Sequence, residues 1–429
     1  MFRFLGRKFK TEFMAENPVT QSNLWSTSES TAVSVTGLVE YALYHFTVCG
    51  PEDGPWPRQF QVLDEEETAK ELRALAKPQS AVLDGRRVDS LNFQPSPTYR
   101  TQDRYVVRTV DVGGRLWTLT GVFDGHLGDI TVEHNAHREQ PEKLTDPAFI
   151  SDVFSRSITA FDDAIANDVL ALFGGIKGLE SYTDEDIRHV INDHHHGGDN
   201  FRKARLNMYG TTALVALVDP DHRNLWVANL GDCQAILVTS TPKDSWDVRT
   251  LTTIHNGDNE DEIERVRSQH PNEPECVVDG RVLGALAPTR SCTGLGDTPF
   301  KQPPEFTRRI LYNLSPGLPD KSPWEEFLNR NKSPPYVSTE PEIVHRQLDD
   351  STQRFLVLCS DGFVDLCRAE GENAVIDDWA KHWRGDNLAL GLLHRALGGE
   401  DTYRVSKVLT LQDMEGAWID DTALVVQTL

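Results

Sequence analysis

The stretch from Leu116 to His126 reads LWTLTGVFDGH and decides the fold. Its apolar and β-branched residues predict a strand from Arg115 to Phe123, which stops abruptly at Asp124. The run from Tyr105 to Val112 predicts a partner strand, joined to the first through the Gly113-Gly114 turn. A hairpin of this kind indicates an antiparallel sheet.

Outside this hairpin the sequence contains groups of strands and groups of helices. One amphipathic helix is predicted from apolar residues spaced by three or four positions, namely Phe154, Ile158, Phe161, Ile165 and Val169. Further strands are predicted at Thr211–Val218, Asn224–Val238, Phe355–Cys359 and Ala423–Val426, and further helices at Glu65–Ala76, Asn259–Gln269, Asn373–Trp383 and Leu388–Leu397. A strict strand–helix–strand alternation is absent, which argues against a doubly wound parallel fold. We therefore expect an α+β fold with antiparallel sheets.

Four of the predicted strands end or begin at aspartate. The residues are Asp124, Asp232, Asp361 and the pair Asp420-Asp421, and Gly125 and Gly362 follow two of them. Each dipeptide alone is typical of a turn, but strands of packed sheets bring their ends to a common edge. Carboxylates that converge there repel one another unless a counter-ion lies between them. Mg²⁺ or Mn²⁺ fits a site of oxygen ligands without sulfur, and two such ions about 3.5–4 Å apart support phosphoryl transfer.

Composition narrows the classes of function. The chain has 43 Lys and Arg against 66 Asp and Glu, which gives a net charge of −23 at pH 7. Such a field repels nucleic-acid phosphates, so no nucleic-acid partner is expected. No uninterrupted apolar run approaches the roughly 20 residues of a membrane helix, so no integral membrane association is expected. The six cysteines form no CxxC pair, which indicates reduced thiols in an intracellular compartment.

Several of these stretches together resemble one family. The segment TGVFDGH at Thr120–His126 is similar to the VFDGH signature of the metal-dependent (PPM, type 2C) protein serine/threonine phosphatases. Further blocks resemble that family in order: GTTA at Gly210–Ala213, VANLGD at Val227–Asp232, FLVLCSDG at Phe355–Gly362 and DDT at Asp420–Thr422. The resemblance covers about residues 95 to 429. It implies the family's β-sandwich of two antiparallel sheets flanked by helices.

Two other stretches resemble one branch of the family. They lie between His255 and Pro271 and between Pro335 and Glu342, and both are similar to pyruvate dehydrogenase phosphatases. The branch motifs are not catalytic. They bear on the substrate rather than on the reaction.

The resemblance also implies roles by position. Asp124 would bridge two Mg²⁺ or Mn²⁺ ions, Gly125 would offer its carbonyl to one of them, and Asp361 and Asp420 would complete the site. Asp103 would act directly or through water. A weaker third metal site would be formed by Asp361 with Asp232 and Asp365. His126 would protonate the leaving alkoxide, while a metal-bridging hydroxide attacks phosphorus directly, without a covalent phosphoenzyme.

The chain departs from the family pattern at several positions. Gln102 stands where the family usually has Glu, and Thr98 stands where it often has a phosphate-binding Arg. Arg100 or Arg104 could substitute for that Arg, or the metals alone could hold the phosphate. The other departures are Leu127 in place of Gly, Asp421 in place of Asn, and an altered block with an insertion at Arg290–Asp297. These changes affect substrate handling more than metal binding.

Other conspicuous residues have simpler interpretations. His194, His195 and His196 are flanked by polar residues and glycine, so a solvated loop is favoured over a metal cluster. Cys359 lies inside an apolar strand and is interpreted as a buried structural thiol. The acidic run Asp258–Glu264 does not have EF-hand spacing and is interpreted as a solvated helix face.

Two regions are distinguished along the chain. Residues 1–60 are expected to be an N-terminal extension, either targeting or disordered, and residues 61–429 the phosphatase domain, with a loop-rich insertion near 291–340. The first ten residues, MFRFLGRKFK, are basic, and no acid occurs before Glu12. This resembles a mitochondrial presequence, but also an ordinary basic start. Mitochondrial and cytoplasmic locations therefore both stay open.

Three functions are compatible with these observations. The leading one is a Mg²⁺/Mn²⁺-dependent phosphatase whose partner is a phosphoprotein substrate, with a mitochondrial dehydrogenase complex as one candidate. The second is a catalytically impaired scaffold or phosphoprotein-binding protein, suggested by Gln102, Thr98 and the altered block at Arg290–Asp297. The third is a metal-dependent hydrolase of small phosphate esters. The oligomeric state is left open by the sequence.

Overall fold

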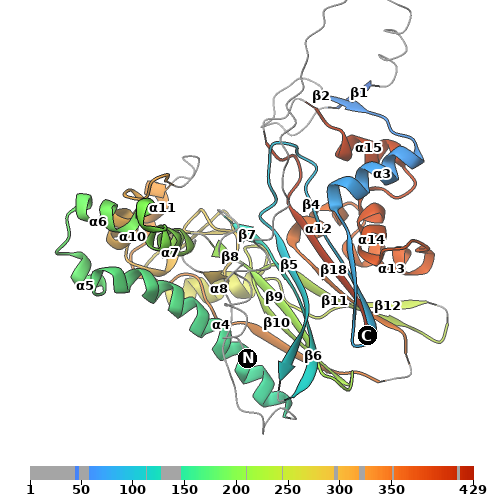
Figure 1. The fold of residues 1–429 in the computed structure, drawn as a ribbon, viewed down its shortest axis with the longest axis horizontal. Helices are drawn as coiled ribbons and strands as arrows, with labels where there is room; N and C mark the ends of the chain where they lie inside the picture. Colours follow the sequence, from blue (N-terminus) through green and yellow to red (C-terminus); the bar gives the residue numbers. More distant parts are fainter. Residues whose placement is uncertain are drawn as a thin grey trace, which may run out of the picture.

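The computed structural model describes residues 44–47, 58–112, 114–126, 146–208, 210–243, 245–293, 298–317, 324–349, 352–412 and 416–429, with the backbone alone at 44–47, 58, 126, 292–293 and 298–299. Two antiparallel sheets lie at its centre, and helices flank both of them (Figure 1). The predicted α+β sandwich is therefore confirmed.

The first sheet has five strands in the order β16-β10-β9-β6-β5. Its strands are β5 (Arg104–Val112), β6 (Arg115–Phe123), β9 (Ala213–Val218), β10 (Asn224–Leu230) and β16 (Glu342–Gln347). The predicted hairpin is β5 and β6, in which Arg104 pairs with Phe123 and Val112 with Arg115. This register places the end of β6 beside the start of β5.

The second sheet has six strands in the order β12-β11-β17-β18-β4-β3. Its strands are β3 (Gln79–Leu83), β4 (Arg86–Phe93), β11 (Gln234–Ser240), β12 (Trp246–Thr250), β17 (Arg354–Cys359) and β18 (Thr422–Thr428). The central strands β17 and β18 are almost wholly buried. Strands buried on both faces are continuous apolar runs rather than alternating ones.

An apolar layer joins the two sheets. Val122 and Val227 of the five-stranded sheet share one buried cluster with Leu356, Leu358 and Val425 of the six-stranded sheet. Side chains of a strand alternate between its two faces, so every second residue of these strands reaches the layer. Full burial of each such side chain contributes about 1.5–3 kcal/mol, and the layer fixes the relative position of the strand ends.

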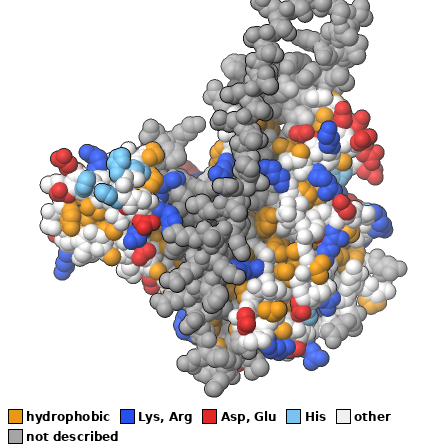
Figure 2. Space-filling view, in the orientation of Figure 1, with side chains coloured by type: hydrophobic (Ala, Val, Ile, Leu, Met, Phe, Trp, Pro, Cys, Tyr) orange, Lys and Arg blue, Asp and Glu red, His pale blue; other side chains and the backbone are white. Residues whose placement is uncertain are grey.

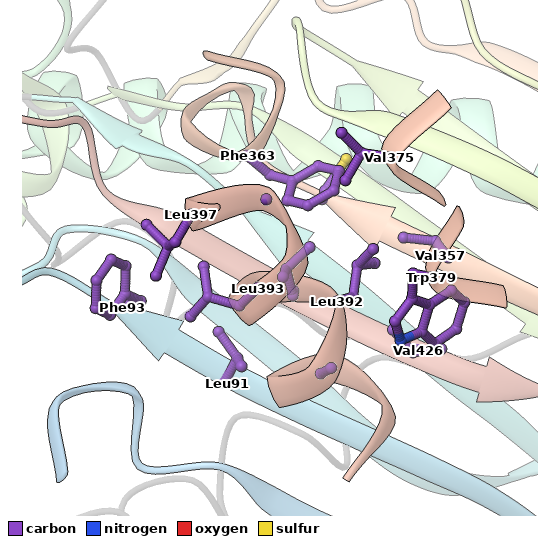
Figure 3. Close-up of a cluster of buried hydrophobic side chains, with 14 of the residues drawn as sticks. Leu91, Phe93, Val357, Phe363, Val375, Trp379, Leu392, Leu393, Leu397 and Val426 are labelled. Atoms are coloured by element: carbon purple, nitrogen blue, oxygen red, sulfur yellow. The ribbon is translucent and has the colours of Figure 1, made fainter. Parts of the chain in front are cut away.

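Helices cover the outer face of each sheet. The helix α4 (Pro147–Leu170) places the predicted apolar stripe, including Phe154 and Phe161, against Trp117 and Leu217 of the five-stranded sheet. The six-stranded sheet is covered by α3 (Glu65–Ala76), α12 (Asp361–Cys367), α13 (Glu372–His382), α14 (Leu388–Leu397) and α15 (Thr402–Leu409). Figure 3 shows Leu393 and Leu397 of α14 near Leu91 and Phe93 of β4.

A helical lobe extends beyond the sandwich, on the left of Figure 1. It consists of the end of α4 with η5 (Ala171–Phe173), α5 (Ile176–Leu179), α6 (Asp184–Ile191), η6 (His194–His196), α7 (Asp199–Met208), α9 (Thr298–Lys301) and α10 (Pro304–Leu311). A separate buried cluster holds most of it together, including Ile187, Met208 and Ile310. His194, His195 and His196 are exposed, as predicted, and Figure 2 shows histidines gathered at the outer end of the lobe.

A second small substructure, here called the flap, lies between the lobe and the sandwich. It comprises α8 (Glu260–Gln269) and the hairpin of β13 (Val277–Val278) and β14 (Arg281–Val282). Ile263 and Val282 of the flap pack with Phe327 of α11 (Trp324–Arg330). Short strands complete the structure: β7 (Gly125–His126), β8 (Gly210–Thr211) and β15 (Cys292–Thr293) form one sheet, and β1 (Tyr44–Thr47) pairs with β2 (Arg58–Gln61).

Two sequence predictions need correction. The run Asn224–Val238 is two strands in different sheets, because Gly231, with a φ of 123°, turns the chain after β10. The segment 296–340 is more helical than expected, since it contains α9, α10 and α11. Most of the predicted extension 1–60 lies outside the described residues. Within the described ranges, no helix is both long enough and apolar enough to cross a membrane.

Candidate functional site

The predicted aspartates meet at one end of the sandwich, because each follows or precedes a core strand. Asp124 comes directly after β6, and Asp232 comes two residues after β10. On the other sheet, Asp361 follows β17 after one residue, and Asp420 lies two residues before β18. Carboxylate oxygens of Asp124, Asp232 and Asp361 all lie within 4.8 Å of one another. Asp232 and Asp361, which the resemblance places together in a third metal site, therefore both lie close to Asp124.

These carboxylates occupy the wall of a cavity of about 370 Å³. The acidic part of the wall contains Asp124, Asp232, Asp361, Asp420 and Asp421, together with Gly125 and Gln102. The other part is apolar. It includes Leu286 and Pro288, which follow the flap hairpin, Phe300 of α9, and Trp324 and Phe327 of α11. The cavity is therefore a cleft with an acidic wall and an apolar wall, and ligand sites commonly combine apolar side chains with a few polar groups.

Burial and mutual repulsion raise the pKa values of the clustered acids. Burial raises the pKa of Asp361 to about 8, and the charges of Asp232, Asp420 and Asp103 add to the effect. Burial also raises the pKa of Asp124 well above its usual range, with Asp103 and Asp361 as the nearest negative charges. A set of carboxylates that cannot all ionise together requires either protons or cations.

Asp103 lies behind the cleft and is 1% exposed. Burial, together with the charges of Asp421 and Asp420, raises its pKa to about 7, although a hydrogen bond from Ser360 partly opposes this rise. Its Oδ2 atom is buried and has no hydrogen-bond partner among the described residues. A buried carboxylate oxygen without a partner is costly unless a cation binds it. An all-oxygen set of this kind fits Mg²⁺ or Mn²⁺.

The backbone around Asp124 is fixed by the GTTA segment. Thr212 Oγ1 accepts a hydrogen bond from Asp124 N at 3.1 Å, and Asp124 O accepts from Thr212 N at 2.8 Å and from Thr211 Oγ1 at 2.9 Å. Gly231 packs against the same threonine, so that an added Cβ would lie 2.5 Å from Thr212 Cβ. Thr212, which belongs to neither β6 nor β10, therefore contacts the backbone at Asp124 and at Gly231, the neighbour of Asp232.

Asp421 and Gln102, two departures from the family pattern, are joined by a hydrogen bond in the acidic wall of the cleft. Asp421 Oδ2 accepts a hydrogen bond from Gln102 N at 2.6 Å, and its Oδ1 accepts from Gln94 Nε2 at 2.9 Å. The backbone of Asp421 also packs directly against Gly362, because a Cβ added there would lie 1.9 Å from the carbonyl oxygen of Asp421. Asp421 therefore connects the β5 side of the site with the start of α12.

The predicted third site is more open. Asp365 is exposed on α12 and forms an ion pair with Arg368 at 2.9 Å. It lines a second cavity of about 390 Å³, which also contains Asp232, Asp361 and Asp420. The second cavity therefore shares three carboxylates with the first.

The remaining catalytic candidate is only partly described. The backbone of His126 forms β7 and pairs with Gly210, but its side chain and the whole of Leu127 lie outside the described residues. The altered block 290–297 is described at Arg290 and Ser291, and by its backbone alone at Cys292 and Thr293. Its acidic end, Asp297, also lies outside the described residues.

Glu262 corrects the interpretation of the run Asp258–Glu264 as a solvated face. Its side chain is 5% exposed and receives hydrogen bonds from Arg290, Arg265 and Thr289. Burial alone would raise the pKa of Glu262, but these three hydrogen bonds outweigh it and lower the pKa to about 2. Arg290 of the altered block therefore anchors the flap. The sequence did not predict the pair of Glu262 and Arg290, because nothing in an acidic run distinguishes the one residue whose side chain is buried.

His255 is a second residue that sequence reasoning did not assign. It is 2% exposed, and its Nδ1 accepts a hydrogen bond from Gly231 N at 3.2 Å. Burial lowers the pKa of His255 to about 4, so the ring is neutral at physiological pH. Asn256 next to it donates to Asp232 Oδ2 at 3.2 Å. The branch motif at His255 thus supports the backbone and side chain of the cluster.

Fold and site together define a two-sheet sandwich with a cluster of carboxylates at one end that could hold a cation. The family model described as Protein phosphatase 2C matches residues 116–397. The chain belongs to this family of protein serine/threonine phosphatases, whose activity depends on Mg²⁺ or Mn²⁺.

Individual relatives are named as protein phosphatases. A protein phosphatase 2C homolog of Schizosaccharomyces pombe is 27% identical over 339 residues, which is 71% of this chain and 71% of that protein. The mitochondrial pyruvate dehydrogenase phosphatase 1 of Saccharomyces cerevisiae is 28% identical over 266 residues, which is 60% of this chain and 44% of that protein. The chain thus spans less than half of the latter. The solved serine-threonine phosphatase 2C of Toxoplasma gondii is 16% identical, with a TM-score of 0.42, over 82% of this chain and 98% of that one.

Proposed function

We propose that the chain hydrolyses phosphoserine and phosphothreonine in proteins, with two Mg²⁺ or Mn²⁺ ions at the acidic cluster and a weaker third. Asp124, Gly125 O, Asp361 and Asp420 would hold the two ions, with Asp103 acting directly or through water. Asp232 and Asp365 would hold the third together with Asp361. Bound ions of this type neutralise phosphate charge and acidify water. The observation that carries the proposal is the convergence of Asp124, Asp232 and Asp361 within 4.8 Å.

The composition of the cleft favours attack by water over transfer to a side-chain hydroxyl or thiol. The described residues that line it include no serine, threonine or cysteine. The two thiols closest in sequence to the cluster, Cys233 and Cys359, are buried, and burial raises both of their pKa values. A thiol that stays protonated is a poor nucleophile. Direct hydrolysis is therefore the simplest reaction for these residues.

His126 is proposed as the general acid. An alkoxide leaving group needs a proton, whereas p-nitrophenolate does not, so His126→Ala should slow phosphothreonine hydrolysis about 100-fold or more. Turnover of p-nitrophenyl phosphate by the same variant should change little. Equal losses on both substrates would contradict this role.

The substrate protein is proposed to belong to a mitochondrial dehydrogenase complex. Support comes from the relatives named pyruvate dehydrogenase phosphatase and from the basic residues near Met1. The purified chain should release phosphate from phosphorylated pyruvate dehydrogenase complex faster than from an unrelated phosphoprotein at equal concentration. Equal rates on the two proteins would contradict the substrate assignment but not the phosphatase activity.

The activity itself is tested with a phosphothreonine peptide in Mn²⁺, in Mg²⁺ and in EDTA. Asp361→Asn removes one cluster carboxylate, and Asp247→Asn, on the exposed edge strand β12, is the matched control. We expect turnover that requires metal, is lost in Asp361→Asn and is retained in Asp247→Asn. Protein that binds Mn²⁺ without any turnover would instead identify an impaired scaffold. Turnover of free phosphate esters alone would identify a small-molecule hydrolase.

A further inference from the structure

The proposed ions do not neutralise all the negative charge that the carboxylates and a bound phosphate would bring to the cleft. Its wall contains five aspartates, and the proposed ion sites add Asp103 and Asp365. When all seven carboxylates are ionised, even three divalent cations leave one negative charge. A phosphate monoester brings a further one and a half to two negative charges, roughly, at neutral pH. Among the described residues that line the cleft, Arg281 is the one cationic side chain. It also lines the second cavity.

The position of Arg281 is set by a tight turn of the flap. Asp279 and Gly280 have φ angles of 51° and 71°, and Val278 pairs with Arg281 across the turn. The turn packs closely on the loop that follows β12: a Cβ added at Gly257 would lie 1.7 Å from the carbonyl oxygen of Gly280. Only a glycine fits such a contact.

That loop connects the turn to the acidic cluster. Asn256, the neighbour of Gly257, donates to Asp232 Oδ2 at 3.2 Å. Two short contacts therefore link the backbone at Arg281 to a carboxylate of the cluster. The backbone that carries the exposed Arg281 side chain is therefore positioned by the same loop that contacts Asp232.

The guanidinium of Arg281 retains most of its hydrogen-bonding capacity. Its Nη1 donates to the carbonyl oxygen of Ala285 at 3.1 Å, and no described carboxylate forms an ion pair with it. Arg104, which the sequence offers as a substitute for the arginine missing at Thr98, donates instead to the carbonyl oxygens of Thr101 and Asp103. Thr98 itself is exposed and outside the cleft lining.

We propose that Arg281 binds the phosphate oxygens of the substrate, an inference that rests on the proposed phosphatase function. A planar guanidinium can donate two parallel hydrogen bonds to a phosphate, which a point charge cannot do. The flap would thus provide the positive charge that the acidic wall of the cleft lacks. Arg281 is a substrate-binding residue here, and the metals would stay on the aspartates.

The test compares Arg281→Ala and Arg281→Lys with Arg267→Ala, which removes an exposed arginine of α8 outside both cavities. The probes are a phosphothreonine peptide, p-nitrophenyl phosphate and inorganic phosphate as a competitive inhibitor, all at saturating Mn²⁺. For Arg281→Ala we expect kcat/KM to fall about 10- to 100-fold on both substrates. The inhibition constant of phosphate should rise by about tenfold or more, with Arg281→Lys intermediate and Arg267→Ala unchanged.

Three results would overturn the inference. The first is an unchanged inhibition constant for phosphate. The second is a loss confined to the peptide, which would place Arg281 against the polypeptide rather than the phosphate. The third is a parallel rise in the Mn²⁺ concentration needed for activity. Calorimetric binding of inorganic phosphate to wild-type and Arg281→Lys protein in Mn²⁺ gives the same comparison without turnover. Failure of the phosphatase proposal would therefore be distinguishable from failure of this one.

Discussion

The raised pKa values at the cluster predict that the metal-free protein loses stability as pH rises. Asp103 and Asp361 have pKa values of about 7 and about 8 in the folded state, against about 3.9 in an unfolded chain. Between these values the folded protein holds protons that the unfolded chain has released. The free energy of unfolding therefore decreases as pH rises through this window and is highest below pH about 4 from these two groups.

The measurement belongs between pH 6.5 and 8. Burial lowers the pKa of His255 to about 4, and a histidine of this kind changes stability in the opposite sense below its unfolded value of about 6.5. Starting from pH 6.5, Asp361 keeps its proton in the folded state for about one and a half further pH units, and Asp103 for about half a unit. Over each of these ranges stability falls with pH. At about 1.4 kcal/mol per unit, the expected loss is about 3 kcal/mol. For a chain of this length, unfolding entropy is about 0.9 kcal/mol/K, so this corresponds to a fall in Tm of roughly 3 °C.

The assay is thermal unfolding in EDTA and in saturating Mn²⁺ at pH 6.5, 7.2 and 8. In EDTA the Tm should fall with pH. In Mn²⁺ it should not, because the metal binds the ionised carboxylates and its stabilising effect grows as protons leave. Asp361→Asn should flatten the dependence in EDTA. A metal-free Tm that is constant or rises over this range, or an equal Mn²⁺ effect at all three values, would refute the reasoning.

Three further substitutions test the framework of the site. Gly362→Ala places a Cβ 1.9 Å from the Asp421 carbonyl oxygen, so stability should fall by about 1–3 kcal/mol and peptide hydrolysis should be lost; wild-type activity would contradict the close packing. Glu262→Gln leaves Arg290 without its buried charge partner, and urea unfolding should show a loss of about 3–5 kcal/mol, whereas a loss below 1 kcal/mol would show that the flap is held otherwise. Thr212→Val removes the acceptor for the N–H at the end of β6; the stability cost should be about 1 kcal/mol and Mn²⁺ should bind more weakly, so unchanged calorimetric affinity would argue against a positioning role.

The sequence predicts elements well where the local signals are strong. The helix α14 begins and ends as predicted, because Asn387 accepts a hydrogen bond from Leu390 N and Gly398 ends it. The helix α3 also has its predicted bounds, with a capping box between Asp64 and Glu67. The cluster of aspartates was predictable for a similar reason. An apolar strand that stops at an acid is a local pattern, and sheet packing then brings such ends together.

Tertiary contacts account for what the sequence did not predict. The split of Asn224–Val238 into β10 and β11 depends on which sheet each half joins, which periodicity does not reveal. Glu262 differs from its acidic neighbours in being buried and in its ion pairs with Arg265 of the same helix and with Arg290. Arg281 lies about 157 residues from Asp124 in the sequence, and its position in the cleft follows from the contact of Gly257 with Gly280. No local pattern records such contacts.

The most direct test of the central proposal is diffraction from crystals grown in Mn²⁺, with anomalous difference maps at the manganese edge. The proposal predicts two strong peaks, both next to Asp124, with Asp361 and Asp420 as neighbours, and a weaker third near Asp365. Soaking the crystals in EDTA should remove all of them. Strong peaks elsewhere, or none at the aspartate cluster, would contradict the assignment of this site as the metal centre of the phosphatase.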